Sequence, residues 1–377
     1  MKLIHNPRSF QKDTIVRNAS KYGFANPWAV ELFLWDLEIA AQLQSTSGEL
    51  ILKGGSAAQL FLPVEAQRGS RDIDMLALMS RSKVEQVLKE TERTFDGPKF
   101  IPFVPRNPNE NLPLVTYTLP IKSNFHAGES TIKVDFLLEG PDLPSVDVRD
   151  RETFAVKTVK LRCLRPEVLV GEKTLTLARE SIGIQDYGDL PKHVYDVSML
   201  VESTDFRGLA GVATAIKVIT PIEATIHGME VDPVDAVHHV IRFIDAELGP
   251  VDTTFANNGV KRSFESFESF YAPTSQQGTL EEWSARALKI GFLAKLVQGL
   301  LRGKFKSTVG DSIFKRARSL ATALQRVKGV EAVDARKALL ATMKRTPYYK
   351  ELRGKALHRV FWQVATPENL EDLPDFT

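Results

Sequence analysis

The sequence predicts an α+β protein, in which a mixed sheet of about five strands lies in the N-terminal half and helices make up the rest. Two observations support this fold class. Before residue 165, short apolar stretches bounded by glycine, proline or polar residues alternate with helical patterns, as is typical of strands and helices that share one domain. Beyond residue 165, apolar residues recur mainly at helical spacing. Because 377 residues exceed the usual size of a single domain, we expect two, one of residues 1–204 and an all-α one of residues 205–377.

The first domain is expected to open with helices in residues 1–45, ahead of a core in residues 46–204. Asn26-Pro27 is a helix start signal, and Ser47-Gly48 ends the helical pattern that follows it. The core then begins with the order strand, turn, helix, strand. We expect strands at 49–53, 72–79, 114–121, 131–139 and 154–164, and helices at 56–62 and 80–95, the second of these capped by Ser80.

Helix signals dominate after residue 165, and no internal repeat is evident. The expected helices are 165–180, 190–202, 233–248, 280–301, 311–327 and 332–344. The second domain is therefore expected to contain helices alone.

The composition excludes several classes of protein. With 43% apolar and 25% charged residues the chain is close to the average soluble globular protein. Its first residues lack the apolar core of a signal peptide, and no apolar run approaches the roughly 18 residues of a membrane span, so we expect a cytoplasmic protein without membrane contact. Cys163 is the only cysteine. Intramolecular disulfides and cysteine-based zinc sites are thus excluded, and its strand-like surroundings predict a buried, inert thiol.

The net charge of +2 conceals a basic C-terminal region. Between Arg286 and Arg359 there are 19 Lys or Arg residues and four acidic ones, an excess of 15 positive charges. An excess of this size is typical of proteins that hold nucleic-acid phosphates, although solvated faces of amphipathic helices would also account for it. The candidate RNA-binding residues are Arg302, Lys304, Lys306, Lys315, Arg316 and Arg318. Tyr348, Tyr349 and Phe361 could stack on bases, with core packing as the alternative.

Two aspartates on one predicted strand indicate a metal site. Asp72 and Asp74 are two residues apart, so their side chains leave the same face of the strand and can share a cation. Asp135 interrupts an otherwise apolar strand, where a buried carboxylate needs a compensating cation. We expect that cation to be Mg²⁺ rather than Lys133, on the view that neighbouring strand positions face opposite sides. The alternatives are a turn-capping role for Asp72, and an edge position or another cation for Asp135.

The segment Lys53-Gly54-Gly55-Ser56 follows a predicted strand and opens a predicted helix. Backbone N–H groups of such a turn, together with the helix N-terminus, form an anion site where triphosphate oxygens can bind. Ser70 lies two residues before Asp72, and its hydroxyl could reach a phosphate, although an ordinary loop serine remains possible. Converging carboxylates beside a phosphate site are what nucleotidyl transfer requires, because the metal neutralises the triphosphate and aligns the attacking oxygen.

Two charged residues lie on apolar helix faces. Lys173 shares a face with Leu169 and Leu177, so its ammonium group needs an anion to meet it, which could be the triphosphate. Asp196 likewise lies on an apolar helix face, where an ion pair with Lys192 four residues earlier is the alternative to a role in the site.

Taken in order, these motifs resemble those of the AbiEii/AbiGii (MenT-like) nucleotidyltransferase toxins of the polymerase β-type superfamily. The resemblance covers roughly residues 25–203. It rests on Lys53-Gly54-Gly55-Ser56, Arg68-x-Ser70-x-Asp72-x-Asp74, the strand of Asp135, Glu172-Lys173 and Lys192-x-x-Tyr195-Asp196. It implies a polymerase β-like fold for the first domain, and it implies that Ser70, Asp72, Lys173 and Asp196 are activity residues. Together with Asp74 they form the predicted catalytic set, and Lys173 joins the predicted nucleotide-binding set.

The resemblance also implies a biological role. The expected protein is a Mg²⁺-dependent toxin that transfers a nucleoside monophosphate from an NTP to an RNA, with the 3′ end of tRNA as the first candidate, and so blocks translation. A cognate antitoxin, in a toxin–antitoxin or phage-defence system, is the expected partner. Two alternatives stay open, namely nucleotidylation of a protein partner and a catalytically inert RNA-binding module of the same fold.

Overall fold

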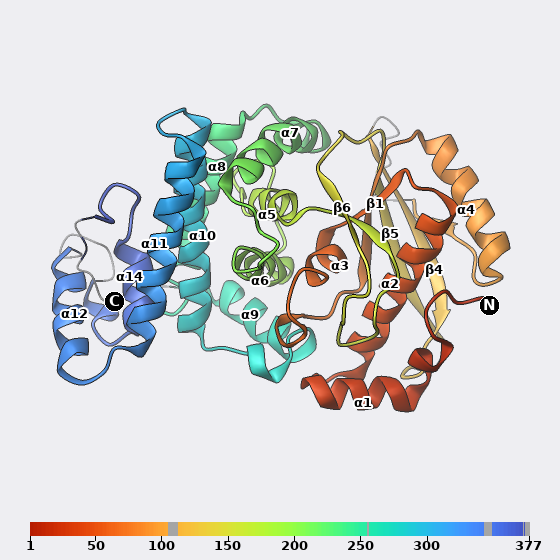
Figure 1. Ribbon diagram of the computed structural model, residues 1–377, viewed down its shortest axis with the longest axis horizontal. Coiled ribbons are helices and arrows are strands. Elements are labelled where there is room, and N and C mark those ends of the chain that lie inside the picture. The colour runs from red at the N-terminus through yellow and green to blue at the C-terminus, as the bar shows by residue number, and fades with distance from the viewer. Residues whose placement is uncertain (105–111, 255, 343–348, 372, 374–377) are drawn as a thin grey trace. The chain divides into compact units, whose positions relative to one another are not determined.

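The computed structural model of the chain describes all residues except 105–111, 255, 343–348, 372 and 374–377 (Figure 1). The chain forms two compact units, each of which we describe by itself. The sheet unit comprises Met1–Leu169, Glu202–Phe206 and Phe267–Gln277. The helical unit comprises Val170–Val201, Arg207–Ser266 and Gly278–Thr377.

The sheet unit is built on a mixed sheet of seven strands in the order β3-β4-β5-β2-β1-β7-β6. The strands are β1 Leu50–Lys53, β2 Asp72–Ala77, β3 Ile101–Pro102, β4 Leu114–Lys122, β5 Glu129–Leu137, β6 Ser145–Val148 and β7 Leu161–Leu164. Strand β2 is parallel to β5, and β1 is parallel to β7, while the other neighbours are antiparallel. The mixed α+β fold is confirmed, with two strands more than expected, because the edge strands β3 and β6, of two and four residues, are too short for a clear strand pattern.

Helices of this unit pack against the sheet or against one another, because their apolar faces need burial. They are α1 Lys12–Tyr22, α2 Pro27–Thr46, α3 Gly54–Gln59 and α4 Arg81–Phe95, with short 3₁₀ turns at Pro7–Phe10, Val64–Ala66 and Thr274–Gln276. Helix α2 starts as the sequence indicates, with the Asn26 side chain accepting a hydrogen bond from the N–H of Trp28 and Pro27 in the first turn. It lies across the sheet (Figure 1) and is buried on nearly every side between Ala29 and Leu43. Three carboxyl groups are buried in this helix, at Glu31, Asp36 and Glu38.

The helical unit is centred on α10, Leu280–Leu301, which packs against most of the other helices. The remaining elements are α5 Pro166–Leu175, a 3₁₀ turn at Tyr187–Asp189, α6 Leu190–Leu200, α7 Leu209–His227, α8 Pro233–Phe243 with a π-helical turn Ile244–Leu248, α9 Asn258–Phe270, α11 Ser307–Arg326, α12 Gly329–Thr342, α13 Tyr349–Leu352 and α14 Leu357–Val364. Of these, residues 166–169 of α5 and 267–270 of α9 are counted with the sheet unit. Four of the expected helices differ by a few residues. The helix expected at 165–180 ends five residues early, at Leu175. Residues 343–344 of the helix expected at 332–344 lie outside the described residues.

Among the described residues, α7 alone has the length and mean hydropathy of a membrane-spanning helix. Lys217, Glu223 and Pro221 interrupt its apolar residues, and the helix packs against α8, α10 and α11. Its apolar face is therefore used in packing within the helical unit.

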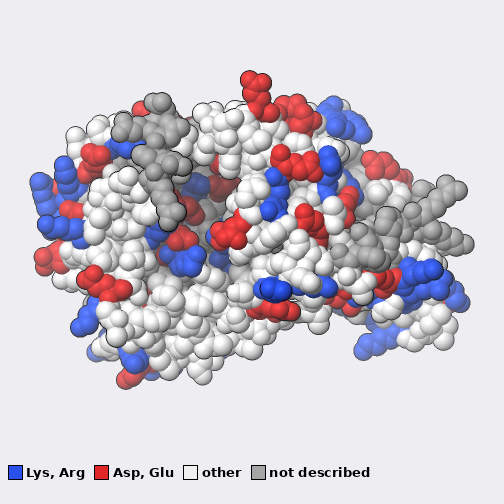
Figure 2. Space-filling model, turned by 180° about the vertical axis from the view of Figure 1, so that it is seen from behind, with Lys and Arg blue, Asp and Glu red and all other residues white. Residues whose placement is uncertain are grey.

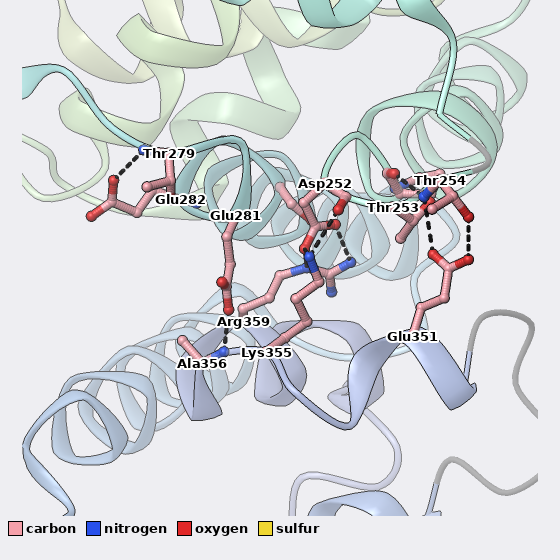
Figure 3. A network of polar contacts seen from close by, with 12 residues as sticks. Asp252, Thr253, Thr254, Thr279, Glu281, Glu282, Glu351, Lys355, Ala356 and Arg359 are labelled. Atoms are coloured by element: carbon pink, nitrogen blue, oxygen red, sulfur yellow. Dashed lines mark hydrogen bonds and ion pairs between the residues drawn. The ribbon is translucent and has the colours of Figure 1, made fainter.

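The C-terminal helices are attached to the rest of the helical unit by charged groups centred on the buried pair Asp252 and Arg359 (Figure 3). The Asp252 carboxylate accepts hydrogen bonds from the guanidinium group of Arg359 (3.1 and 3.3 Å) and lies 3.2 Å from Lys355 Nζ. Arg359, itself fully buried, also donates to the carbonyl oxygen of Gly249. Glu281 accepts from the N–H of Ala356, which ties α14 to the first turn of α10.

Candidate active site

The strand register places a row of polar side chains across four neighbouring strands of the sheet unit. Lys53 on β1 is paired with Asp74 on β2, Asp74 with Asp135 on β5, and Asp135 with Thr116 on β4. Directly paired residues leave the same face of a sheet, and residue 72 lies two positions before residue 74. The three aspartates expected to bind metal therefore share one face, which for Asp72 and Asp74 agrees with their spacing in the sequence.

Lys133 lies among these carboxylates, and our expectation about it was wrong. Its Nζ is 2.7 Å from Asp135 Oδ2, and Thr116 Oγ1 donates to the other oxygen of that carboxylate at 2.5 Å. Lys133 and Asp135 are two positions apart on β5, so their side chains leave the same face of the strand rather than opposite faces. Burial acts to lower the pKa of Lys133, but the hydrogen bond to Asp135 and the charges of Asp135, Asp72 and Asp74 outweigh it and raise that pKa.

The carboxylates of this row provide oxygen ligands of the kind that divalent cations prefer. Within the described residues, no three His, Cys, Asp or Glu side chains lie close enough together to hold a metal ion by themselves. Mg²⁺ rarely uses such a cage, because it keeps several waters and binds through one or two carboxylates together with the phosphates of its substrate. Asp72 and Asp74, which are partly exposed, supply hard oxygen ligands of that kind. The donor set therefore fits Mg²⁺ that arrives with a nucleotide.

The glycine turn and the Asp-x-Asp strand are in direct contact. Gly54 adopts a left-handed conformation (φ +66°), and a Cβ atom at this position would overlap the Asp74 carboxylate. A Cβ atom at Gly55 would lie 3.1 Å from the Arg68 guanidinium group and 3.2 Å from Ser70 Oγ. Gly54 is thus required by the close approach of the second motif to the first, whereas a side chain at Gly55 would press on Arg68 and Ser70.

Behind this turn lies a buried carboxyl group, that of Asp36, which none of the sequence motifs indicated. Ser56 Oγ donates to Asp36 Oδ2 on α2 (2.8 Å), and it lies 3.1 Å from Ser70 Oγ. Asp36 and Ser56 are fully buried, and Ser70 is nearly so. Burial raises the pKa of Asp36 well above its ordinary value of 3.8, and the charges of Asp72 and Asp74 add to this, whereas hydrogen bonds from Ser56 and Ser70 oppose it. The Ser56 hydroxyl therefore faces Asp36 and Ser70 in the interior.

The other two predicted catalytic residues lie together in the helical unit. Lys173 Nζ on α5 is 2.8 Å from Asp196 Oδ2 on α6, and both side chains are almost completely buried. The anion that meets Lys173 in this structure is thus Asp196. The alternative pair between Lys192 and Asp196 is not formed, because Lys192 contacts Asp189 at 2.8 Å instead.

Only part of the basic C-terminal region is available to a polyanion. Of the six candidate RNA-binding residues, Arg302, Lys304, Lys306, Lys315 and Arg316 are exposed, whereas Arg318 donates to the carbonyl oxygen of Val201. Arg359 is buried and Lys355 is partly buried, and both contact the Asp252 carboxylate (Figure 3). A group of Lys and Arg side chains is visible over the C-terminal helices in Figure 2.

The aromatic candidates contribute less to such a surface than the basic ones. Phe361 is buried against Trp362, as core packing requires. Tyr349 is partly exposed beneath Arg353, and Tyr348 lies outside the described residues. Cys163 is fully buried, as expected, and burial raises the pKa of its thiol.

Comparison with solved structures finds proteins of distant similarity. No curated protein matches the chain in sequence. Among solved structures, a candidate nucleotidyltransferase from H. pylori is similar at 14% identity and a TM-score of 0.41, over 72% of this chain and 96% of its own. JHP933 from Helicobacter pylori follows at 12% identity and a TM-score of 0.38, over 80% and 96%. An antigenic nucleotidyltransferase-like protein from Paracoccidioides brasiliensis follows at 11% identity and a TM-score of 0.34, over 54% and 94%.

A family model is matched by more than half of the chain. The model describes the nucleotidyl transferase AbiEii toxin of type IV toxin–antitoxin systems, and it matches residues 37–260. This span contains the Gly54-Gly55 turn and the Asp72-x-Asp74 strand of the sheet unit, and the Lys173–Asp196 pair of the helical unit. The chain belongs to the AbiEii family of nucleotidyltransferase toxins.

Proposed function

We propose that this nucleotidyltransferase toxin transfers a nucleoside monophosphate from an NTP to the 3′ end of an RNA, with tRNA as the first candidate, in a reaction that depends on Mg²⁺. The observation that carries the proposal is the row of carboxylates on β2 and β5 in direct contact with the glycine turn. A hydroxyl oxygen of the acceptor attacks the α-phosphorus of the NTP, and the bond from that phosphorus to the pyrophosphate oxygen breaks.

Each part of the site has a proposed task. Asp72 and Asp74 hold Mg²⁺·NTP, and the cation, when bound, neutralises the triphosphate and the leaving pyrophosphate. Asp135 completes the row of carboxylates, and its ion pair holds Lys133 beside Asp72 and Asp74. The backbone of Gly54 and Gly55 and the side chains of Lys53 and Ser70 face the phosphates, with Ser56 supporting them from inside.

Lys173 and Asp196 complete the proposed catalytic set. Their ion pair fixes the ammonium group, so that Lys173 can neutralise phosphate charge without being free to move. We assign the catalytic role to residues 1–204 and acceptor binding to the basic helices of residues 205–377. Since tRNA and NTPs are cytoplasmic, so is the proposed place of action.

The acceptor can be identified by where label accumulates. Purified protein is incubated with Mg²⁺, each NTP labelled at the α-phosphate in turn, and a pool of cellular RNA and protein. Label in a tRNA-sized band that is lost with Asp72→Ala supports the proposal. Label in protein instead identifies a protein partner as the acceptor. RNA binding without any label, and without dependence on NTP or Mg²⁺, identifies an inert binding module and contradicts the proposal.

A matched control separates the site from its scaffold. Asp147 lies on β6 and contacts Lys160, away from the carboxylate row. Asp147→Ala makes the same change on the same sheet and is expected to keep wild-type labelling.

The toxin role needs a second measurement in cells. The family is that of type IV toxin–antitoxin pairs, and we propose a cognate antitoxin and a role in phage defence for this chain. Expression without the antitoxin is expected to arrest growth, and Asp72→Ala is expected to abolish the arrest.

A further inference from the structure

We propose that Asp36 is a positioning residue of this active site, whose buried carboxyl group orients Ser56 and, through it, the hydroxyl of Ser70. This inference rests on the proposed function, because it concerns how the same site binds an NTP. It adds a residue on α2, outside the glycine and aspartate motifs.

The geometry forms a chain from the helix interior to the phosphate side of the turn. Ser56 Oγ lies 2.8 Å from Asp36 Oδ2, 3.1 Å from Ser70 Oγ and 3.5 Å from the carbonyl oxygen of Asp72. A hydroxyl has one proton, so Ser56 can serve only one of these three acceptors fully. The carboxyl group of Asp36 therefore decides where the Ser56 proton points.

The fold alone does not explain a carboxyl group at this position. Asp36 is fully buried in an apolar helix, and its Oδ1 has no hydrogen-bond partner among the described residues. A buried acid with an unsatisfied oxygen costs stability, whereas an apolar residue of similar size would not. The pKa of Asp36 is raised, which favours a neutral carboxyl group that can both donate and accept. Such a group is suited to orienting a hydroxyl without adding charge beneath the carboxylate row.

Another carboxyl group of the same helix provides a matched control. Glu31 is also fully buried on α2, but it accepts hydrogen bonds from Ser123 and Asn124 rather than from the turn. Glu31→Gln and Asp36→Asn make the same chemical change in the same helix.

The test measures the affinity for each NTP with Mg²⁺, together with the thermal midpoint, for the full chain. Asp36→Leu is expected to keep or raise the midpoint and to weaken NTP binding about tenfold, as the loss of one ordered hydrogen bond to a charged group would. Asp36→Asn keeps a donor and an acceptor and is expected to restore binding to within about threefold. Glu31→Gln is expected to bind as the wild type does.

A double-mutant cycle keeps the proposal testable even when the leucine variant fails to fold. If Asp36 acts through Ser56, then Ser56→Ala loses as much affinity as Asp36→Leu, and the double variant loses no more. The positioning role is overturned if Ser56→Ala or Asp36→Leu binds the NTP with wild-type affinity, or if the two losses of affinity are fully additive. In that case the wild type still binds the NTP, and the proposed function stands. A wild-type protein that binds none of the four NTPs overturns both.

Discussion

Gly54 is the residue on which the two sheet motifs depend most directly. Replacing it with alanine forces a side chain into a left-handed backbone and against the Asp74 carboxylate. We expect Gly54→Ala to lower the stability by about 1–3 kcal/mol and to lower transfer activity at least about a hundredfold, because Asp74 has to move.

Gly228 provides the comparison for this change. It has nearly the same φ, +63°, but no atom lies within 4 Å of where its Cβ would stand. Gly228→Ala should therefore lower the free energy of unfolding by about 1 kcal/mol, through the strained backbone alone, and keep its activity. Thermal unfolding and transfer rates measured on both variants check this, and equal activities would contradict the role given to the Gly54–Asp74 contact.

Local rules predicted part of the site and missed the rest. The shared face of Asp72 and Asp74 follows from the period of a strand, which is a local property. The same rule, misapplied to residues two positions apart, gave the wrong expectation for Lys133 and Asp135. Asp36 was missed because its partner Ser56 is 20 residues away, and only the packing of α2 beneath the turn joins them.

At the scale of elements, a buried acid ties the N-terminal segment to α2. Glu38 accepts hydrogen bonds from the N–H groups of Ile4 and His5 and from His5 Nδ1 at 2.8 Å. Burial acts to raise the pKa of Glu38, but the hydrogen bonds from His5, Ile4 and Gln42 outweigh it and lower that pKa below 4.5. Because the pKa is depressed in the folded state, the stabilisation is present above pH 4.5 and is lost as the pH falls through the folded-state value.

Glu38→Gln is therefore expected to be less stable than the wild type by about 1–3 kcal/mol at neutral pH. The difference should shrink as the pH falls below 4.5, because protonation removes the same charge from the wild type. Denaturant unfolding of both proteins across pH 3 to 7 measures it. A difference that is constant with pH would show that the carboxylate charge contributes nothing.

The Lys173–Asp196 pair joins α5 and α6, and two variants separate its structural role from its chemical one. Lys173→Met leaves a buried carboxylate without this partner and should cost about 3–5 kcal/mol. The double variant Lys173→Met/Asp196→Leu should recover most of that stability, since a buried ion pair can be replaced by apolar residues. Transfer activity should stay lost in both. An active double variant would show that the pair serves the fold alone.

Element positions followed from the sequence where periodicity and end signals agreed. Helix α10 was predicted to the residue, because its Thr279 capping box and apolar pattern coincide. Helices α7 and α9 were missed. Helix α7 is rich in β-branched residues and contains Pro221, and α9 begins at an Asn-Gly sequence typical of turns. In both, packing in the helical unit overrides local preference.

For the whole molecule, the proposed binding of RNA by the basic helices predicts a particular response to salt. Lys315 and Arg316 are exposed on α11. If each contacts a phosphate, Lys315→Gln/Arg316→Gln should weaken RNA binding and reduce the slope of log affinity against log salt by about 0.7 per contact for single-stranded RNA. The control is Lys83→Gln/Lys89→Gln, which removes two exposed charges from α4 of the sheet unit. Equal slopes in the two variants would contradict a site on the basic helices.

The central claim is that the carboxylates beside the glycine turn carry out nucleotidyl transfer, and one rate comparison tests it. Wild type, Asp74→Asn and the control Asp147→Asn are first shown to have the same thermal midpoint within a few degrees. Transfer of label from an NTP labelled at the α-phosphate is then measured with Mg²⁺ and with chelator. The account predicts transfer by the wild type and the control only with Mg²⁺, and a rate at least about a hundredfold lower for Asp74→Asn. Wild-type transfer by a folded Asp74→Asn variant would contradict it.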